Sequence, residues 1–413
     1  MPAELTAAPP GHLKHPYWIL AAICLLAMMN TIGVAMPYPI LAPIFVAGPA
    51  DGFTHFAGFE PSVLMGVALA VNPLGILLGS LVTGPMSDRY GRRSVMTVTL
   101  LATFVGYLVT AAALASRNYP LFVLSRFVTG LTESNTAVAR ALVADMHEQV
   151  DRTQAFAWLN ACMYSGWLLG PLVGGLTLPF GEPVPFVLAL WLPPSTPRPG
   201  APHPQHPRGA MRGKNLLAVL RSDRVLGLVF GLQLAYTLSL TSMYEYAPLW
   251  MLKFAGLDGR GIAFVTAGQC AMMTLASAAA GRFGSASRDP LRRAAQCALV
   301  AAACCATLAV APGVPGLAAI VVFGLPTALY NAVMPAWMSE RFAAHGQGRV
   351  MGLLSTIFCV SNVVVAVAGG WIALLSTRWI MGLGGVAGVV AAALMLRLAR
   401  TERAPGVAAE LAS

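Results

Sequence analysis

The stretch that decides the fold runs Gly84-Pro-Met-Ser-Asp-Arg-Tyr-Gly-Arg-Arg93. It joins two apolar runs, residues 62–83 and 94–115, and each run is long enough to cross a bilayer core of about 30 Å. The segment itself carries an acid and three arginines, which makes it too polar to lie in lipid. By charge alone it is equally a plain basic loop or a specialised turn whose glycines allow close helix approach. Both interpretations predict two membrane helices joined by a short turn.

The composition of the whole chain excludes several classes of protein. Of its 413 residues, 10% are charged and 57% are hydrophobic, whereas soluble domains carry about 25% charged residues. So few charges cannot cover the surface of a soluble protein. A soluble enzyme, a secreted disulfide scaffold and a disordered protein are therefore excluded. All seven cysteines fall in apolar runs without metal-ligand spacing, so we expect no metal site. We predict an all-α polytopic membrane protein.

Apolar runs recur from end to end and predict twelve transmembrane helices. The expected spans lie at about 17–41, 62–83, 94–115, 120–143, 155–176, 178–194, 224–247, 261–281, 294–312, 316–338, 349–371 and 379–397. The sixth is awkward, because its cleanly apolar part, residues 184–192, is short. If it did not cross, every basic loop of the second half would face outward. We therefore expect a shortened or distorted sixth span.

The basic residues predict the orientation of the chain. With the N-terminus inside, 21 of the 26 lysines and arginines lie on the cytoplasmic side, four lie outside, and Arg126 falls within a span. This asymmetry follows the positive-inside rule. The net charge of +10 therefore reports topology rather than a nucleic-acid partner. We expect a multi-pass protein of the bacterial inner membrane, with both termini cytoplasmic and acting as a monomer.

A proline-rich segment divides the spans into six and six. Seven prolines fall within residues 193–207 and three basic residues follow by position 214, which is typical of an extended linker. The expected organisation is a cytoplasmic tail at 1–16, an N-terminal six-helix bundle at 17–194, a cytoplasmic linker at 195–215, a C-terminal six-helix bundle at 216–397 and a cytoplasmic tail at 398–413. Two such bundles predict parallel repeats around a central cavity.

Several motifs resemble those of the major facilitator superfamily. The opening stretch, with Asp-Arg between its glycines and two trailing arginines, is similar to the signature loop of that superfamily. Arg126-Phe-Val-Thr-Gly130 resembles its Arg-x-x-x-Gly element, and Ala144-Asp145 with Asp151-Arg152 resembles the loop that follows. Residues 166–175, Gly-Trp-Leu-Leu-Gly-Pro-Leu-Val-Gly-Gly, resemble the element of the drug:proton antiporters. The first half looks most like the twelve-span branch that includes tetracycline exporters.

This resemblance implies a set of residues for conformational gating. They are Gly84, Asp88, Arg89, Gly91, Arg92, Arg93, Asp145, Arg152, Gly166, Gly170, Pro171, Gly174 and Gly175. Small residues at 166, 170 and 174 also share one helical face, which lets a neighbouring helix pack closely, and Pro171 permits a bend. A generic small-residue interface is the alternative to a sliding contact between the two halves.

Three ionisable residues lie within or near the fourth span. Arg126, Glu133 and Arg140 are spaced by seven, so they share nearly one face at about 10 Å per step. This is too far for direct pairing within the helix, so each needs a partner on another span or water. Charges at membrane depth are functional candidates. Glu133 is either a proton-carrying carboxylate in an aqueous cavity or part of a static ion pair, and the resemblance implies that Arg126 tunes its proton affinity.

The first span departs from the pattern of the exporters. Asn30-Thr-Ile-Gly33 followed by Met36-Pro37 resembles their Asp-x-x-Gly…Pro segment, with Asn30 where an acid is usual. An amide binds substrate by hydrogen bonds but carries no proton, which leaves the coupling stoichiometry open. Prolines 37, 39 and 43 predict a broken helix end.

Mid-span polar groups are the candidates for a substrate cavity. We select Asn30, Met36, Gln233, Tyr236, Glu245 and Asn331. Gln269 and Asn362 belong to the same class, and all of these are equally explained by interhelical hydrogen bonds. Glu245, between two tyrosines, is either a solvated acid in an outer aromatic belt or a binding carboxylate.

These features predict a secondary transporter that exports small organic molecules by proton antiport and alternating access. The proton gradient would be its energy source, with no cofactor, because the chain has no phosphate-binding glycine loop. One alternative is an exporter dedicated to an endogenous metabolite such as a siderophore, with Arg126 favouring anionic or zwitterionic cargo. Another is an uncoupled facilitator or importer. A non-transporting sensor is a poor alternative, because the chain has no sizeable soluble domain, and an enzyme is poorer still.

Overall fold

The computed structural model describes residues 16–133, 152–188, 224–283, 289–341 and 347–401, with positions 139 and 143. The helices of the first half are α1 (Pro16–Ala35), α2 (Pro37–Ala42), α3 (Pro61–Tyr90), α4 (Arg92–Ala115), α5 (Tyr119–Glu133), α7 (Arg152–Thr177) and α8 (Val184–Leu188). Those of the second half are α10 (Arg224–Phe254), α11 (Gly259–Phe283), α12 (Pro290–Val310), α13 (Val314–Val322), α14 (Gly324–Arg341), α15 (Gln347–Ile372) and α16 (Thr377–Thr401). A π-helical turn (Pro43–Ala47) and two 3₁₀ turns (Phe56–Gly58 and Leu178–Phe180) complete the described elements.

The helices group into the twelve expected spans, since α1 with α2 and α13 with α14 each form one interrupted span. Eight segments within the described residues are long and apolar enough to cross a membrane by length and composition alone. They are Pro16–Ala47, Pro61–Thr83, Ser94–Ala115, Ala161–Phe180, Pro290–Val310, Val314–Pro335, Leu354–Ile372 and Thr377–Thr401. Of the expected sixth span, a 3₁₀ turn and the five residues of α8 are described, while residues 189–194 and the linker lie outside the described part.

The first span is interrupted where its prolines predict a break. Helix α1 ends at Ala35 and α2 begins at Pro37. The amide of Met36 still donates to the carbonyl of Ile32 at 2.9 Å, so the chain stays helical through the interruption. Pro39 and Pro43 lack backbone donors, and a π-helical turn begins at Pro43.

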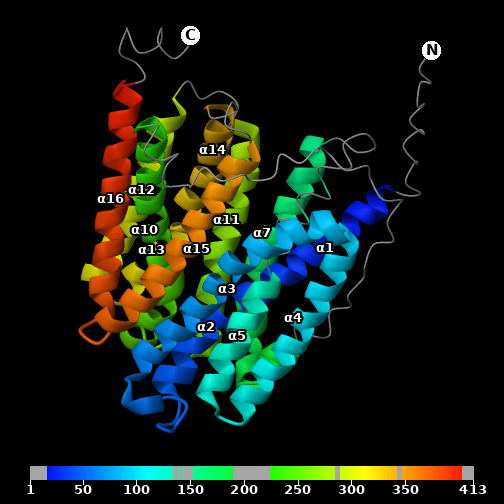
Figure 1. Ribbon diagram of the computed structural model, residues 1–413. Coiled ribbons are helices and arrows are strands. Elements are labelled where there is room, and N and C mark those ends of the chain that lie inside the picture. Colours follow the sequence, from blue (N-terminus) through cyan, green and yellow to red (C-terminus); the bar gives the residue numbers. More distant parts are fainter. Residues whose placement is uncertain are drawn as a thin grey trace, which may run out of the picture.

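The helices form two bundles, one from each half of the chain (Figure 1). Two reciprocal helix–helix contacts join the bundles. In the first half α1 packs on α7, and α5 packs on α3 and α4; in the second half α16 packs on α10 and α12. Between the halves, α3 contacts α15 and α7 contacts α11. These are the second with the eleventh span and the fifth with the eighth. A pseudo-two-fold axis between two six-span repeats produces this reciprocal pairing.

The two ends of the bundle differ in what they carry. We call the end that holds Pro16, Tyr90 and Thr401 the basic end, and the end that holds the 48–60 and 116–118 loops the loop end (Figure 1). Toward the loop end the halves touch backbone to backbone. A Cβ added at Gly66 of α3 would lie 2.4 Å from the carbonyl oxygen of Ala366 in α15. A Cβ added at Gly175 of α7 would lie 2.6 Å from the carbonyl oxygen of Gly259 in α11.

Small residues also hold α3 against α5 within the first half. A Cβ added at Gly75 would lie 2.4 Å from the carbonyl oxygen of Phe127 and 2.9 Å from the Cα of Gly130. Lipid tails are as apolar as the helices, so close packing rather than the hydrophobic effect drives helix association here. This contact positions the segment of α5 that carries Arg126 and Glu133.

Ion pairs tie three loops of the first half together at the loop end. Arg117 binds Asp51 through its Nε at 2.6 Å and pairs with Glu182 through Nη1. Its guanidinium also lies 5.1 Å from the ring centroid of Phe53. Burial raises the pKa of the Asp51 carboxyl, but hydrogen bonds from Arg117 and from two backbone amides outweigh burial and hold that pKa below its usual value.

Substituting Gly75 tests the α3–α5 packing. We expect Gly75→Ala to lower the free energy of unfolding by about 1–3 kcal/mol, because the neighbouring backbone must move to admit the methyl group. Thermal unfolding in detergent, followed by size-exclusion chromatography, measures the loss. Gly231→Ala is the matched control, since a Cβ there meets nothing within 4 Å. Equal stability of the two variants would contradict the packing account.

Substituting Arg117 tests the loop-end ion pairs. Arg117→Gln is expected to destabilise the protein at pH 7 by about 1 kcal/mol or less, the range for partly exposed pairs. Because the folded pKa of Asp51 is lowered, the contribution is present above the unfolded pKa of about 3.9 and lost as pH falls through the folded value. The difference in melting temperature between wild type and variant should therefore shrink between pH 5 and pH 3. A constant difference would refute the assignment to Asp51.

Candidate functional site

A pocket lies between the two halves and is lined by five helices. Its walls come from α1 and α2, from α7, and from α10 and α11 of the other half. The lining residues are Ala35, Tyr38, Trp167, Pro171, Met243, Tyr244, Ala247, Pro248, Met251, Thr266, Gln269 and Cys270. A pocket shared by both halves changes shape whenever one half moves against the other, as alternating access requires.

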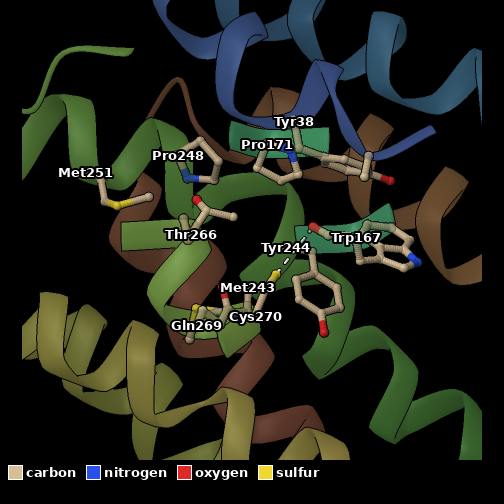
Figure 2. Close-up of a pocket in the computed structure, with 12 residues that line it drawn as sticks. Tyr38, Trp167, Pro171, Met243, Tyr244, Pro248, Met251, Thr266, Gln269 and Cys270 are labelled. Carbon is tan, nitrogen blue, oxygen red and sulfur yellow. Dashed lines mark hydrogen bonds between the residues drawn. The ribbon is translucent and has the colours of Figure 1, made fainter. Parts of the chain in front are cut away.

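Aromatic rings form one side of this pocket (Figure 2). The ring centroids of Tyr38 and Trp167 are 5.9 Å apart, and Trp167 stacks on Tyr244 at 5.8 Å. The hydroxyl of Tyr38 donates to Oδ1 of Asn362 in α15 at 3.3 Å, so this ring also bridges the two halves. Flat aromatic faces of this kind accept planar or cationic groups.

Gln269 supplies a polar group to the otherwise apolar wall. Its side chain is 4% exposed, and its amide nitrogen has no hydrogen-bond partner within the described part of the chain. The neighbouring Cys270 thiol lies 3.4 Å from the backbone oxygen of Trp167 and links α11 to α7 (Figure 2). A buried donor without a partner carries a desolvation cost that a ligand acceptor would relieve.

The carboxyl group of Glu133 is held by donors from two other helices. Asn72 of α3 donates to Oε2 at 2.7 Å, and the hydroxyl of Tyr107 in α4 donates to Oε1. The side chain of Asn30 in α1 donates to the backbone oxygen of Glu133 at 3.0 Å. The glutamate itself is 1% exposed. Neutral donors thus satisfy this carboxyl group. They come from other spans, as the seven-residue spacing of Arg126 and Glu133 along the helix predicts.

A glycine makes room for the Tyr107 hydroxyl. A Cβ added at Gly33 would lie 1.7 Å from that oxygen. Any larger residue at position 33 would push the phenol away from Glu133. The Asn30–Gly33 segment therefore supports the acid twice, through an amide donor and through space for Tyr107.

Arg126 lies in the same buried region with an unused donor. It is 3% exposed, and its Nη1 has no partner among the described residues. Its guanidinium lies 6.0 Å from the ring centroid of Phe186. Tyr107 interacts electrostatically with both Arg126 and Glu133 and so links the two charges without a direct ion pair in the described part of α5. Arg140 lies outside the described residues.

The other predicted cavity residues do not line the pocket. Met36 is fully buried, Gln233 accepts from the hydroxyl of Tyr330 at 2.7 Å, and Tyr236 stacks on Tyr330 at 3.5 Å. Glu245 is 2% exposed, which excludes a water-exposed acid in this conformation. None of the six predicted cavity residues, Asn30 and Asn331 included, is among those lining the pocket. Their role in cargo binding stays a prediction.

The signature stretch forms the α3–α4 turn. Gly84, Asp88 and Arg89 fall within α3, while Arg92 and Arg93 begin α4. Gly91 between the two helices has φ of 87°, a left-handed conformation that favours glycine. The guanidinium of Arg89 lies 5.3 Å from the ring centroid of Tyr90. The side chains of the other charged residues of this turn, and the whole of Asp145, lie outside the described part; Arg152 begins α7.

The glycines of the fifth span divide between two neighbours. Gly166, Gly170 and Gly174 lie against α1 and α2 of the same half, where added Cβ atoms would approach Met28, Ile32 and Met36. Gly175 faces Gly259 and Ala263 of α11 in the other half, and Pro171 lines the pocket. The face shared by Gly166, Gly170 and Gly174 thus packs within one bundle. The neighbouring Gly175 contacts the other bundle.

Sequence reasoning missed three residues of this region. Asn72 and Tyr107 lie near the middle of their spans, as Glu133 does, so matched membrane depth was a usable signal. Trp167 falls inside the span-five motif, for which the prediction was based on the glycines and Pro171. No cluster of three or more metal-ligating side chains occurs in the described ranges.

Relatives of known function match the chain over part of its length. The tetracycline resistance protein, class B, of Escherichia coli is 30% identical over 170 residues, which are 40% of this chain and 39% of that protein. The class C protein of the same organism is 31% identical over 163 residues, 39% of this chain and 38% of that protein. The chain thus spans about two-fifths of the length of these relatives.

The fold has solved counterparts, and a family description covers most of the chain. The human organic anion transporter MFSD10 aligns with 93% of this chain and 100% of its own at a TM-score of 0.63 and 17% identity. A D-xylose-proton symporter aligns with 92% and 97% at a TM-score of 0.69 and 17% identity. The sequence model of the Major Facilitator Superfamily matches residues 18–316 and 290–412. The chain therefore belongs to the major facilitator superfamily, and it is a multi-pass membrane protein.

Proposed function

We propose that this transporter exports small organic molecules across the bacterial inner membrane by proton antiport. The observation that carries the proposal is the buried group of Glu133, Arg126, Asn72 and Tyr107, which lies in the same half as part of a pocket shared by both halves. A carboxyl group at membrane depth is costly, and such groups typically mark substrate pathways or proton relays. The partial matches to tetracycline resistance proteins support the export direction.

In this proposal the basic end faces the cytoplasm. Support comes from the excess of lysine and arginine that the sequence assigns to that side. The loop end then faces outward, and the contacts of Gly66 with Ala366 and of Gly175 with Gly259 close the outer side of the pocket. Cargo enters the pocket from the cytoplasm and leaves when these contacts part.

The pocket and Arg126 indicate the chemistry of the cargo. Trp167 and Tyr244 offer aromatic faces, and Gln269 offers a donor. Arg126 adds a buried guanidinium with an unused donor in the same half. Together they favour planar molecules with an anionic or zwitterionic group over simple organic cations.

Asn30 supports a second candidate, an uncoupled facilitator. Its amide cannot carry a proton, and it donates to the backbone of Glu133. With one acid fewer at this position, transport without proton coupling is the main alternative. It predicts transport that a protonophore leaves unchanged.

Accumulation assays test the antiport proposal. Efflux-deficient bacteria expressing the chain are expected to accumulate less tetracycline and fluorescein, with ethidium least affected, and a protonophore should abolish the difference. Glu133→Gln should slow protonophore-sensitive export by about tenfold or more, equivalent to ~1.4 kcal/mol in the barrier. Glu60→Gln, an exposed acid, is the matched control and should export normally. Full proton-driven export by Glu133→Gln would refute the coupling role.

Removing the Tyr107 hydroxyl tests how Glu133 is held. We expect Tyr107→Phe to lower the free energy of unfolding by about 1–3 kcal/mol, because a buried carboxylate oxygen loses its donor. In a Glu133→Gln background the same change should cost less, since the bond is no longer charge-assisted. Thermal unfolding in detergent gives both values, and Tyr90→Phe on an exposed tyrosine is the control. Equal losses in both backgrounds would argue against the bond.

A further inference from the structure

Glu245 is a second buried acid, and it lies in the half opposite Glu133. It sits on α10 and is 2% exposed, and neither carboxyl oxygen has a hydrogen-bond partner among the described residues. Glu133, by contrast, accepts from two donors. Burial of a charged carboxylate without a partner costs far more than burial of the neutral acid. In this conformation Glu245 therefore carries its proton.

The neighbours of Glu245 supply no counter-charge. Tyr38 from α2 and the adjacent Tyr246 are the titratable side chains that interact with it in the described part of the chain. Both are phenols and are neutral at physiological pH. Tyr38 also interacts electrostatically with Arg126 and Glu133 of the first half.

Charged residues of the helices packed around α10 lie at helix ends. Arg292 and Arg293 are in the first turn of α12, Arg397 and Arg400 are in the last turns of α16, and Arg378 begins α16 beside Phe254. On α11, Asp258 and Arg260 flank the start of the helix. Helix α2 carries no charged residue, and the charged residue of α15, Arg349, lies near the start of that helix. Within the described part of the chain, the middle of α10 is thus surrounded by uncharged side chains.

The residue next to Glu245 is built into the contact between the halves. The hydroxyl of Tyr246 donates to the carbonyl oxygen of Ala366 at 2.6 Å. A Cβ added at Gly369 would lie 2.4 Å from its ring, and one added at Gly66 would lie 3.3 Å from its hydroxyl. We call this close contact of α3 with α15, at Gly66, Ala366, Gly369 and Gly370, the outer seam. Tyr246 is packed into the outer seam, so movement of the seam also moves the turn of α10 that carries Glu245.

We propose that Glu245 is a protonation site that controls the outer seam, which closes only when this carboxyl group has bound a proton. The inference rests on the proposed antiport and adds an acid in the second half to Glu133 in the first. With the seam open, Glu245 meets water and ionises like an exposed glutamate. With the seam closed, it is buried without a partner and stays neutral. The closed state therefore holds one proton more than the open state.

This difference sets the sign of a pH effect. A state that binds the extra proton is favoured at low pH, and its population falls as pH rises. Above the ordinary range of an exposed glutamate, about pH 4.3, the ratio of closed to open molecules should therefore fall tenfold per pH unit.

Fluorescent labels across the outer seam measure this ratio without any cargo. Phe59 and Trp371 lie on its two sides with ring centroids 6.4 Å apart, and both are about half exposed. The double variant Phe59→Cys/Trp371→Cys is labelled with pyrene maleimide at pH 7 and placed in phosphatidylethanolamine–phosphatidylglycerol nanodiscs. Six of the seven native cysteines are buried, and the wild-type chain labelled in parallel gives the background. Excimer emission is high when the seam is closed.

We expect excimer emission to fall from pH 5 to pH 8.5 in the labelled protein and to stay high throughout when Glu245→Gln is added. Glu245→Met has similar volume without a titratable group and should behave alike, which keeps the test valid if the amide variant folds poorly. Glu60→Gln, an exposed acid at the same end, should retain the response. A pH response that survives either Glu245 variant, or no response in the parent, would overturn the inference.

The assay separates this inference from the proposed function. It uses neither cargo nor a proton gradient. Loss of the pH response on substituting Glu245 in a chain that exports nothing would support the protonation site and refute export. Proton-driven export with a pH-independent outer seam would support export and refute the protonation site.

Discussion

The structure depends on the burial of one carboxyl group. Glu133 lies at membrane depth, where an unsatisfied charge is prohibitively expensive, so other helices must bring donors to it. Asn72 and Tyr107 do so from α3 and α4, and Asn30 ties α1 to the same turn of α5. Gly33 leaves the space that Tyr107 needs. Four spans of the first half are thereby joined around a single residue.

The buried acid of the second half has the opposite environment. Glu245 has no donors, and the residue beside it is packed into the contact between the two halves. A satisfied acid strengthens the bundle that contains it, whereas an unsatisfied one penalises the state that buries it. The pocket with Trp167 and Tyr244 is also lined by Tyr38, which interacts electrostatically with both acids. In the proposed mechanism, cargo binding, proton binding and movement of the halves involve neighbouring residues.

Much of the fold is predictable from the sequence because bilayer thickness imposes a length on every span. The apolar runs, an irregular helix end at the prolines of the first span and the close-packing glycines were all predicted and agree with the structure. The seven-residue spacing of Arg126 and Glu133 also predicted that each needs a partner from another helix, and Glu133 has two. The identity of those partners was not predictable, because the rotation of α3 and α4 about their axes depends on packing against every neighbouring helix.

The sequence by itself determined the class of molecule, the number and order of the spans, and the acids and arginine that lie within them. These follow from local chemistry, since hydropathy and charge act residue by residue along the chain. Only the tertiary structure decided that Glu133 is satisfied and Glu245 is not, and that Gly175 rather than Gly170 reaches the other half. Hydrogen bonding and close packing act between helices that are distant in sequence. Their outcome depends on how the helices rotate and approach each other, which no single span encodes.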